Sequence, residues 1–166
     1  DEKYKSLDKD ISLLEEFGNI KYDDIQTLAI KRALEKNFLV ITGGPGSGKT
    51  TIIKSIIDLY QTIHKYNTEK TLEHVALLAP TGRASKRVSE ATNLPASTIH
   101  RFLKCNKELN KFAVNEYNKS DVDFVIIDES SMVDIFLFDS LLKGLRVDTK
   151  IILVGDYNQL PSVGPG

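Results

Sequence analysis

The segment Gly43–Thr51, with the sequence GGPGSGKTT, constrains the fold of this chain more than any other stretch. It matches the pattern G-x-x-x-x-G-K-[ST], in which Lys49 is the lysine and Thr50 is the hydroxyl residue. The apolar run Phe38–Ile41 precedes it, and Thr51–Ile63 has a helical pattern. A strand, a glycine-rich loop and a helix in this order place phosphate at a helix N-terminus. The segment therefore predicts a nucleoside triphosphate site.

Each residue type in this loop has a physical role in holding phosphate. Glycines let the backbone curl so that several N–H groups point into one concavity. The ammonium group of Lys49 can reach the outer phosphates, and the hydroxyl of Thr50 can ligate Mg²⁺. The candidate nucleotide-binding residues are Gly43, Gly44, Pro45, Gly46, Ser47, Gly48, Lys49, Thr50 and Thr51.

Composition narrows the class of protein. The 166 residues are 41% hydrophobic and 27% charged, which suits one ordinary globular domain. A net charge of −1 gives no overall basic field, so any binding of nucleic acid must be local. Cys105 is the single cysteine, which excludes a disulfide framework and a zinc cluster.

The chain shows no signal peptide and no apolar run that approaches the roughly 18 residues of a membrane span. We therefore expect an intracellular, cytoplasmic protein without a membrane partner. The sequence begins at Asp1 rather than at a methionine and stops at Gly166, and we expect both ends to be cuts within a longer protein.

Short apolar runs alternate with helical patterns along the rest of the chain. Because the runs are continuous rather than alternating, they predict strands buried on both faces, in a mainly parallel sheet between two helical layers. We interpret the polar stretch 64–73 as a loop and 104–120 as a surface excursion. A capping box at 131–134 is expected to open a helix, and Ser97 or Thr98 to cap a brief helix through Leu103. The predicted strands are 38–41, 75–79, 122–127 and 151–154, and the main predicted helices are 7–17, 25–34, 51–63, 84–91 and 131–145.

Unusual residues follow all four predicted strands. Gly43–Thr51 follows the first, Pro80–Arg83 the second, Asp128–Glu129 the third and Gly155–Gln159 the fourth. Because the carboxyl ends of parallel strands lie along one edge of a sheet, the four segments are expected to converge there.

The adjacent carboxylates of Asp128 and Glu129 indicate hydrolysis. Asp128 is the candidate that orients Mg²⁺, through a water, and Glu129 is the candidate general base for the attacking water. A small-molecule kinase has less need for the second acid. Gln159 could reach the γ-phosphate or the attacking water, but a loop amide that bonds its own backbone is an equally good interpretation.

The candidate contacts to nucleic acid follow the second strand and the next turn. A helix that begins near Arg83 offers free N–H groups and cationic side chains to a phosphate. Lys86 and Arg87 are weaker candidates, because cations on a helix surface are most often simply solvated. The stronger set is Thr81, Gly82, Arg83, Ser97, Thr98, His100 and Arg101.

Together these segments resemble the first motor domain of superfamily 1 helicases, in the branch of the RecD and TraA-type enzymes. The resemblance rests on DDIQTLAI, TGGPGSGKTT, LLAPTGRASKRVSE, STIHRFL, VIIDESSMVD and ILVGDYNQLPSVGPG, and it covers about residues 20–166. It implies a RecA-like P-loop fold and an ATP- and Mg²⁺-dependent motor that moves 5′ to 3′ on single-stranded DNA, in repair, recombination or conjugation.

The resemblance also assigns roles to residues that spacing alone leaves open. It implies that Gln26 reads adenine, that Gln159 links the γ-phosphate to DNA, and that Thr81–Arg83 and Thr98–Arg101 hold the DNA backbone. Lys is frequent in the family at the position of Arg83, and both residue types can hold phosphate.

The resemblance divides the chain into residues 1–20, a helical linker or the end of a preceding domain, and 21–166, the first motor domain. The family's second motor domain, with its arginine fingers, would follow Gly166. We therefore expect this chain alone to bind nucleotide, to hydrolyse it poorly and to unwind nothing. Two alternatives stay open: a non-catalytic, nucleotide-dependent subunit of a nuclease complex, and an RNA helicase of the same superfamily.

Overall fold

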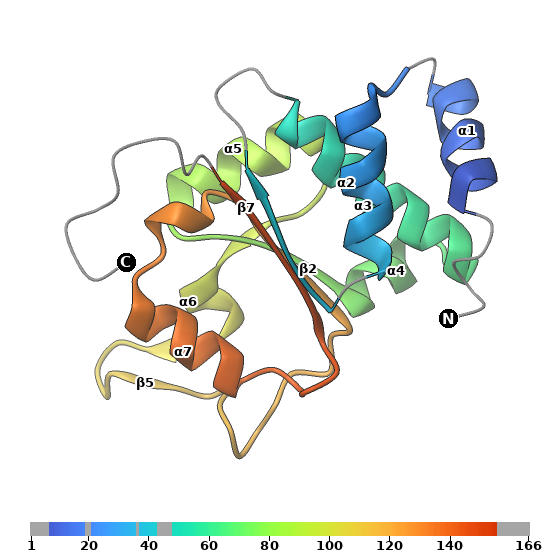
Figure 1. Ribbon diagram of the computed structural model, residues 1–166. Coiled ribbons are helices and arrows are strands. Elements are labelled where there is room, and N and C mark those ends of the chain that lie inside the picture. Colours follow the sequence, from blue (N-terminus) through green and yellow to red (C-terminus); the bar gives the residue numbers. More distant parts are fainter. Residues whose placement is uncertain (1–6, 19–20, 36, 43–47, 156–166) are drawn as a thin grey trace.

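The described residues form a five-stranded parallel sheet with helices on both faces (Figure 1). The computed structural model describes residues 7–18, 21–35, 37–42 and 48–155. The strand order is β1-β7-β6-β2-β3, and every pair of neighbours is parallel. The predicted parallel α/β/α fold is therefore confirmed. The strands are β1 (Phe38–Thr42), β2 (Val75–Ala79), β3 (Ser97–Thr98), β6 (Phe124–Ile127) and β7 (Lys150–Gly155).

The helices follow the predicted alternation closely. A separate antiparallel pair of short strands, β4 (Cys105–Asn106) and β5 (Lys111–Phe112), lies in the stretch that we expected to be a surface excursion. A 3₁₀ turn, η2 (Ser130–Met132), follows β6. The helices are α1 (Leu7–Gly18), α2 (Asp24–Glu35), α3 (Lys49–His64), α4 (Thr68–His74), α5 (Gly82–Thr92), α6 (Ile99–Phe102) and α7 (Ile135–Lys143).

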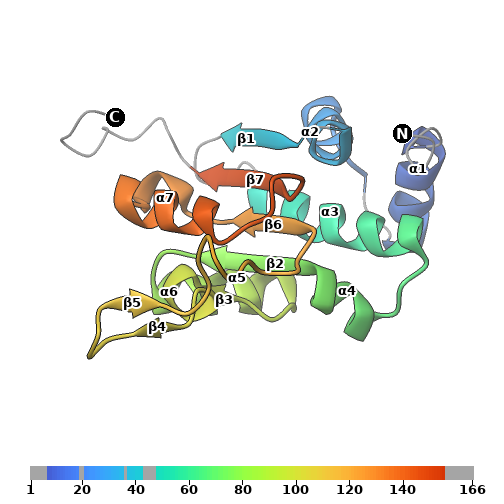
Figure 2. The ribbon, with the colours of Figure 1, turned by 90° about the horizontal axis from the view of Figure 1, so that it is seen from below.

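Alternate residues of the central strands enter two separate cores. On β6, Phe124 and Ile126 join the core under α1, α2, α3 and α5, whereas Val125 and Ile127 join the core under α6 and α7. All four are buried, which is why the strand has no polar alternation. Figure 2 shows the arrows of β1, β7, β6 and β2 pointing the same way. The strand ends that carry the candidate residues therefore share one edge.

The polar stretch after α3 was wrongly predicted to be a loop. It contains α4, whose N-cap is Asn67; the side-chain oxygen of Asn67 accepts a hydrogen bond from the Lys70 amide at 2.7 Å. Thr71 is the only residue of α4 that is buried. A helix that buries so little of its surface needs no apolar stripe, so the hydrophobic pattern could not reveal it.

The predicted capping box at 131–134 was also wrong. Asp134 is itself the N-cap of α7, and its carboxylate accepts a hydrogen bond from the Leu137 amide at 2.8 Å. The residues before it form η2 instead of the first turn of the helix. The spacing of serine and acid was correct for a capping box, but the acid caps the helix that follows it.

The predicted cap at Ser97 or Thr98 is confirmed for Thr98, whose hydroxyl oxygen accepts a hydrogen bond from the Arg101 amide at 3.1 Å. The same two residues also form β3, which pairs with Leu78 and Ala79 of β2. Two residues are too few to show a strand period, so the sequence predicted four of the five strands that the described residues form in the parallel sheet.

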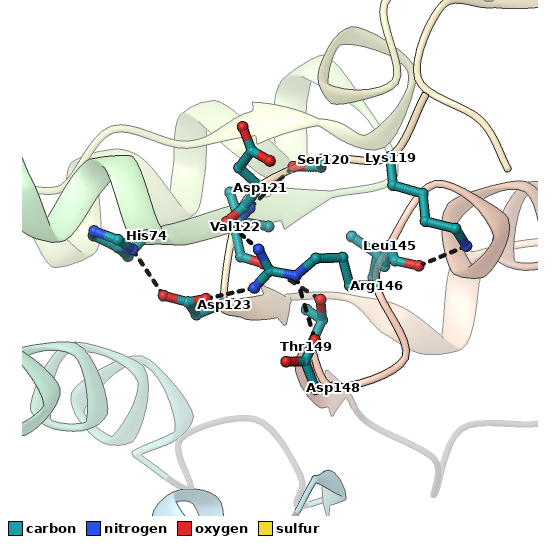
Figure 3. Close-up of polar contacts among 10 residues, drawn as sticks. All are labelled: His74, Lys119, Ser120, Asp121, Val122, Asp123, Leu145, Arg146, Asp148 and Thr149. Atoms are coloured by element: carbon teal, nitrogen blue, oxygen red, sulfur yellow. Dashed lines mark hydrogen bonds and ion pairs between the residues drawn. The ribbon is translucent and has the colours of Figure 1, made fainter. Parts of the chain in front are cut away.

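A polar network closes the opposite edge of the sheet (Figure 3). Asp123 precedes β6, and its carboxylate meets Nδ1 of His74 at 2.7 Å and Nη2 of Arg146 at 2.6 Å. Burial raises the pKa of Asp123, but the hydrogen bonds from Arg146 and His74 outweigh it and hold this pKa below its ordinary value. The network therefore joins the residues that precede β2, β6 and β7.

No helix within the described ranges is long and apolar enough to cross a bilayer.

Candidate functional site

The candidate residues that the structure describes gather at the carboxyl edge of the sheet. Residues 43–47 of the phosphate loop, Gly43, Gly44, Pro45, Gly46 and Ser47, lie outside the described residues, as does Gln159. The described part of the loop is its junction with α3.

Gly48 makes this junction. Its φ of 82° is in the left-handed region, and its carbonyl accepts the first helical bond, from the Ile52 amide at 3.0 Å. A glycine adopts this conformation without steric cost. The next residues, Lys49, Thr50 and Thr51, form the first turn of α3 and are half-buried. The helix therefore starts at the lysine, as a phosphate-binding loop requires.

Gln26 lies against the same junction although it is far away in the sequence. It forms a reciprocal cap with Asp23: the Gln26 amide donates to the Asp23 carboxylate at 2.7 Å, and the Asp23 amide donates to Oε1 of Gln26 at 3.2 Å. Its Nε2 lies where a Cβ on Gly48 would collide with it. Gln26 thus has a structural role at the start of α2 that the sequence did not reveal. Its reading of adenine stays a prediction.

Asp128 directly follows β6 in a partly buried position, where the charge of Lys49 acts on it. Its amide donates to the carbonyl of Leu78 in β2 at 2.8 Å. Burial raises the pKa of Asp128, and repulsion from Glu129 adds to this, while a backbone hydrogen bond from Glu129 and the charges of Lys49 and Arg87 oppose it in part. The net effect is a pKa above the ordinary value. A carboxylate whose charge is incompletely compensated suits a bound cation.

Glu129 follows in a left-handed conformation, with φ of 54°, and about a third of its side chain is exposed. Its Oε1 lies 3.7 Å from Nη1 of Arg87 on α5. The next residue, Ser130, is buried and donates its hydroxyl to the carbonyl of Val154 in β7 at 3.0 Å. The acidic pair is therefore attached to β2 on one side and to β7 on the other.

Sequence reasoning did not assign Ser130 a role and treated Arg87 as a weak candidate for nucleic acid. Ser130 could have been noticed as a small polar residue directly after the acidic pair. Arg87 stands four residues after Arg83, which places both on one face of a helix. These patterns do not predict that Ser130 would bond to β7 or that Arg87 would approach Glu129.

The two candidate segments for nucleic acid begin side by side. Ala79 of β2 pairs with Thr98 of β3, and each strand leads directly into a helix. Thr81 caps α5, with its hydroxyl accepting from the Ala84 amide at 3.1 Å, and Thr98 caps α6. The space around Gly82 is open. Thr81, Gly82, Arg83, His100 and Arg101 are exposed, and Thr98 is half-buried.

Comparison with known proteins places these features in a family. Residues 26–165 match the model of the AAA domain. The chain is 37% identical to the RecBCD enzyme subunit RecD of Buchnera aphidicola, with 92% of this chain and 28% of that protein covered. It is 40% identical to the ATP-dependent RecD2 DNA helicase of Deinococcus radiodurans, with 77% of this chain and 16% of that protein covered. The chain thus spans about a quarter or less of these relatives.

Solved structures agree on the fold. The Pif1 helicase from Bacteroides superposes with a TM-score of 0.59 at 23% identity, covering 90% of this chain and 35% of that one. Such a likeness shows the fold alone, which is the RecA-like α/β fold of P-loop proteins.

Proposed function

This chain belongs to the AAA domain family, and on that premise we propose that it is the ATP-binding motor domain of a RecD-like, ATP-dependent DNA helicase. The observation that carries the proposal is the electrostatic coupling of the acidic turn after β6 to the first turn of α3. There the charge of Lys49 acts on the carboxylate of Asp128. A triphosphate-binding helix and an acidic pair at one sheet edge suit hydrolysis of a phosphoanhydride.

The residues present fit Mg²⁺ and ATP. Thr50 offers a hydroxyl and Asp128 a partly buried carboxylate, and hard oxygen ligands of this kind are what Mg²⁺ prefers. When bound, Mg²⁺ would neutralise charge on the phosphate oxygens. Lys49 would bind the outer phosphates, and Gln26 would contact the base from the start of α2. The phosphate-loop residues 43–47 complete this proposed set.

Glu129 would act as the general base. Its carboxylate would accept a proton from the attacking water, so that the water attacks the γ-phosphorus as the bond to the bridging oxygen breaks and ADP leaves. Gln159 is proposed to hold the γ-phosphate or that water.

The proposed substrate of the motor is single-stranded DNA. Thr81–Arg83 and Thr98–Arg101 would hold its phosphates with helix N–H groups, hydroxyls and cations, and the adjacency of β2 and β3 supports a continuous path between them. Such contacts leave RNA open as an alternative, because they read few features of the sugar. Movement from 5′ to 3′, unwinding and assembly with nuclease subunits are proposed for the longer protein, in the cytoplasm.

The nucleotide site can be tested on this chain alone. We expect it to bind Mg²⁺-ATP in a calorimetric titration, and Lys49→Ala to abolish the binding. Lys54→Ala is the matched control, because Lys54 is an exposed lysine of the same helix that pairs with Asp58 at 3.2 Å. Unchanged binding by Lys49→Ala would contradict the proposal. In the longer protein, loss of unwinding in Lys49→Ala would support a motor, and normal function would support the alternative of a non-catalytic subunit.

A further inference from the structure

Helix α5 connects two parts of the proposed site. Its N-terminal end holds the candidate phosphate contacts Thr81–Arg83, and Arg87 lies one turn further on, about 6 Å along the axis. Arg87 reaches the carboxylate of Glu129, at the end of β6. One rigid helix therefore connects the proposed DNA strand to the proposed general base.

The backbone of α5 is well fixed, while the ion pair that it carries is loose. Ala84, Ser85 and Val88 are buried and fix the helix on the sheet. The Arg87 side chain is 65% exposed, and its Nη1 lies 3.7 Å from Oε1 of Glu129, which is beyond direct hydrogen-bonding distance. Exposed pairs of this kind are weak. A phosphate could displace the carboxylate, because the guanidinium group binds phosphate through two parallel hydrogen bonds.

We propose that Arg87 is a positioning residue that restrains the Glu129 carboxylate until a phosphate of the bound strand takes its guanidinium group. This inference rests on the proposed function. While it pairs with Arg87, the Glu129 carboxylate is directed toward α5 rather than toward the attacking water. Once the strand engages Arg87, the carboxylate is released to accept the proton of the attacking water. Binding of the strand at α5 would thereby stimulate hydrolysis at the end of β6.

The test is steady-state ATP hydrolysis by the full-length protein, with and without saturating single-stranded DNA of poly-dT sequence. We expect Arg87→Gln to raise kcat without DNA about two- to fivefold, the range that an exposed ion pair can supply. The KM for ATP and the kcat with saturating DNA should stay at their wild-type values. The stimulation by DNA should therefore fall by the same factor, and more DNA should be needed for half-maximal stimulation. Arg87→Lys should keep most of the restraint.

Lys143→Gln is the matched control, because it breaks another exposed ion pair, with Asp139 at 3.1 Å on α7, and removes the same charge. Lys143→Gln should leave kcat without DNA, kcat with DNA, the KM for ATP and the DNA concentration for half-maximal stimulation unchanged. If Arg87→Gln lowered kcat equally with and without DNA, Arg87 would assist catalysis directly and the inference would be overturned. It would also be overturned if kcat without DNA were the same in Arg87→Gln and the wild type. If wild-type protein neither bound nor hydrolysed ATP, the proposed function would fail, and this inference with it.

Discussion

Replacing Ser130 by alanine should destabilise the domain through one hydrogen bond that holds the acidic turn. Ser130 is 8% exposed, and its hydroxyl donates to the carbonyl of Val154 at 3.0 Å. The substitution removes the donor without adding bulk. It leaves the carbonyl of Val154 without this donor in a buried place.

The expected cost follows from the kind of bond that is lost. A neutral hydrogen bond contributes about 0.5–1.5 kcal/mol net, and an unsatisfied buried acceptor costs about 1–3 kcal/mol. We therefore expect Ser130→Ala to lower the free energy of unfolding by about 1–2 kcal/mol. For a chain of this length each kcal/mol lowers Tm by about 2–4 °C, so the shift should be about 2–8 °C.

Urea unfolding of the wild type, Ser130→Ala and Ser131→Ala measures this directly. Ser131→Ala is the control, because it deletes the same hydroxyl at the next position, which is half-buried. The midpoint should fall for Ser130→Ala with the slope m unchanged, since the folded state stays equally compact. Equal midpoints for both variants would refute the reasoning that Ser130 ties the acidic turn to β7.

Three further predictions concern charge and backbone conformation. Burial lowers the pKa of Lys150 to about 8, with an opposing effect of Glu35, so the folded state disfavours the ammonium form. The free energy of unfolding should therefore rise as pH increases from about 8 towards 10.5, the pKa of Lys150 in the unfolded chain. In Lys150→Met, the urea midpoint should not show this rise. Folding lowers the pKa of Asp123 below 3.8, the pKa in the unfolded chain. The Asp123 carboxylate therefore stabilises the fold above pH 3.8, and this stabilisation is lost as pH falls through the pKa of the folded state. Asp123→Asn should lower Tm at pH 7, and the difference from wild type should vanish in strong acid; a difference independent of pH would contradict this. Gly48→Ala forces a positive φ on alanine and a collision with Gln26, so it should cost about 1–2 kcal/mol and weaken Mg²⁺-ATP binding in a calorimetric titration. Binding as tight as that of the wild type would show that the junction tolerates a side chain.

The parallel sheet, and the edge at which the described candidate residues gather, were predictable because their signals are local. The run around Phe124–Ile127 is apolar at every position, and a strand buried on both faces requires this. The strand, the tight turn at Gly48 and the helix after it were predictable because the pattern G-x-x-x-x-G-K-[ST] demands specific residue types at specific spacing, whereas the phosphate-binding roles of these residues stay predictions. The caps at Thr98 and Asp134 show the limit of such patterns: Thr98 was a correct candidate, whereas Asp134 caps a helix that was expected to start before it.

The contacts around the acidic pair were not predictable because they join distant strands. The bond from Ser130 to Val154 and the approach of Arg87 to Glu129 depend on the strand order β2-β6-β7, and no local pattern encodes that order. Helix α4 was missed for a different reason, since Thr71 is its only buried residue.

Hydrolysis by Glu129→Gln in the full-length protein tests the central claim most directly. The substitution preserves shape and removes the carboxylate that is proposed to accept the proton. Single-turnover measurement should show Mg²⁺-ATP bound with wild-type affinity and a hydrolysis rate lower by about 10²–10⁴-fold, the range that a general base supplies. Hydrolysis at the wild-type rate would contradict the assignment of the acidic pair as the hydrolytic centre.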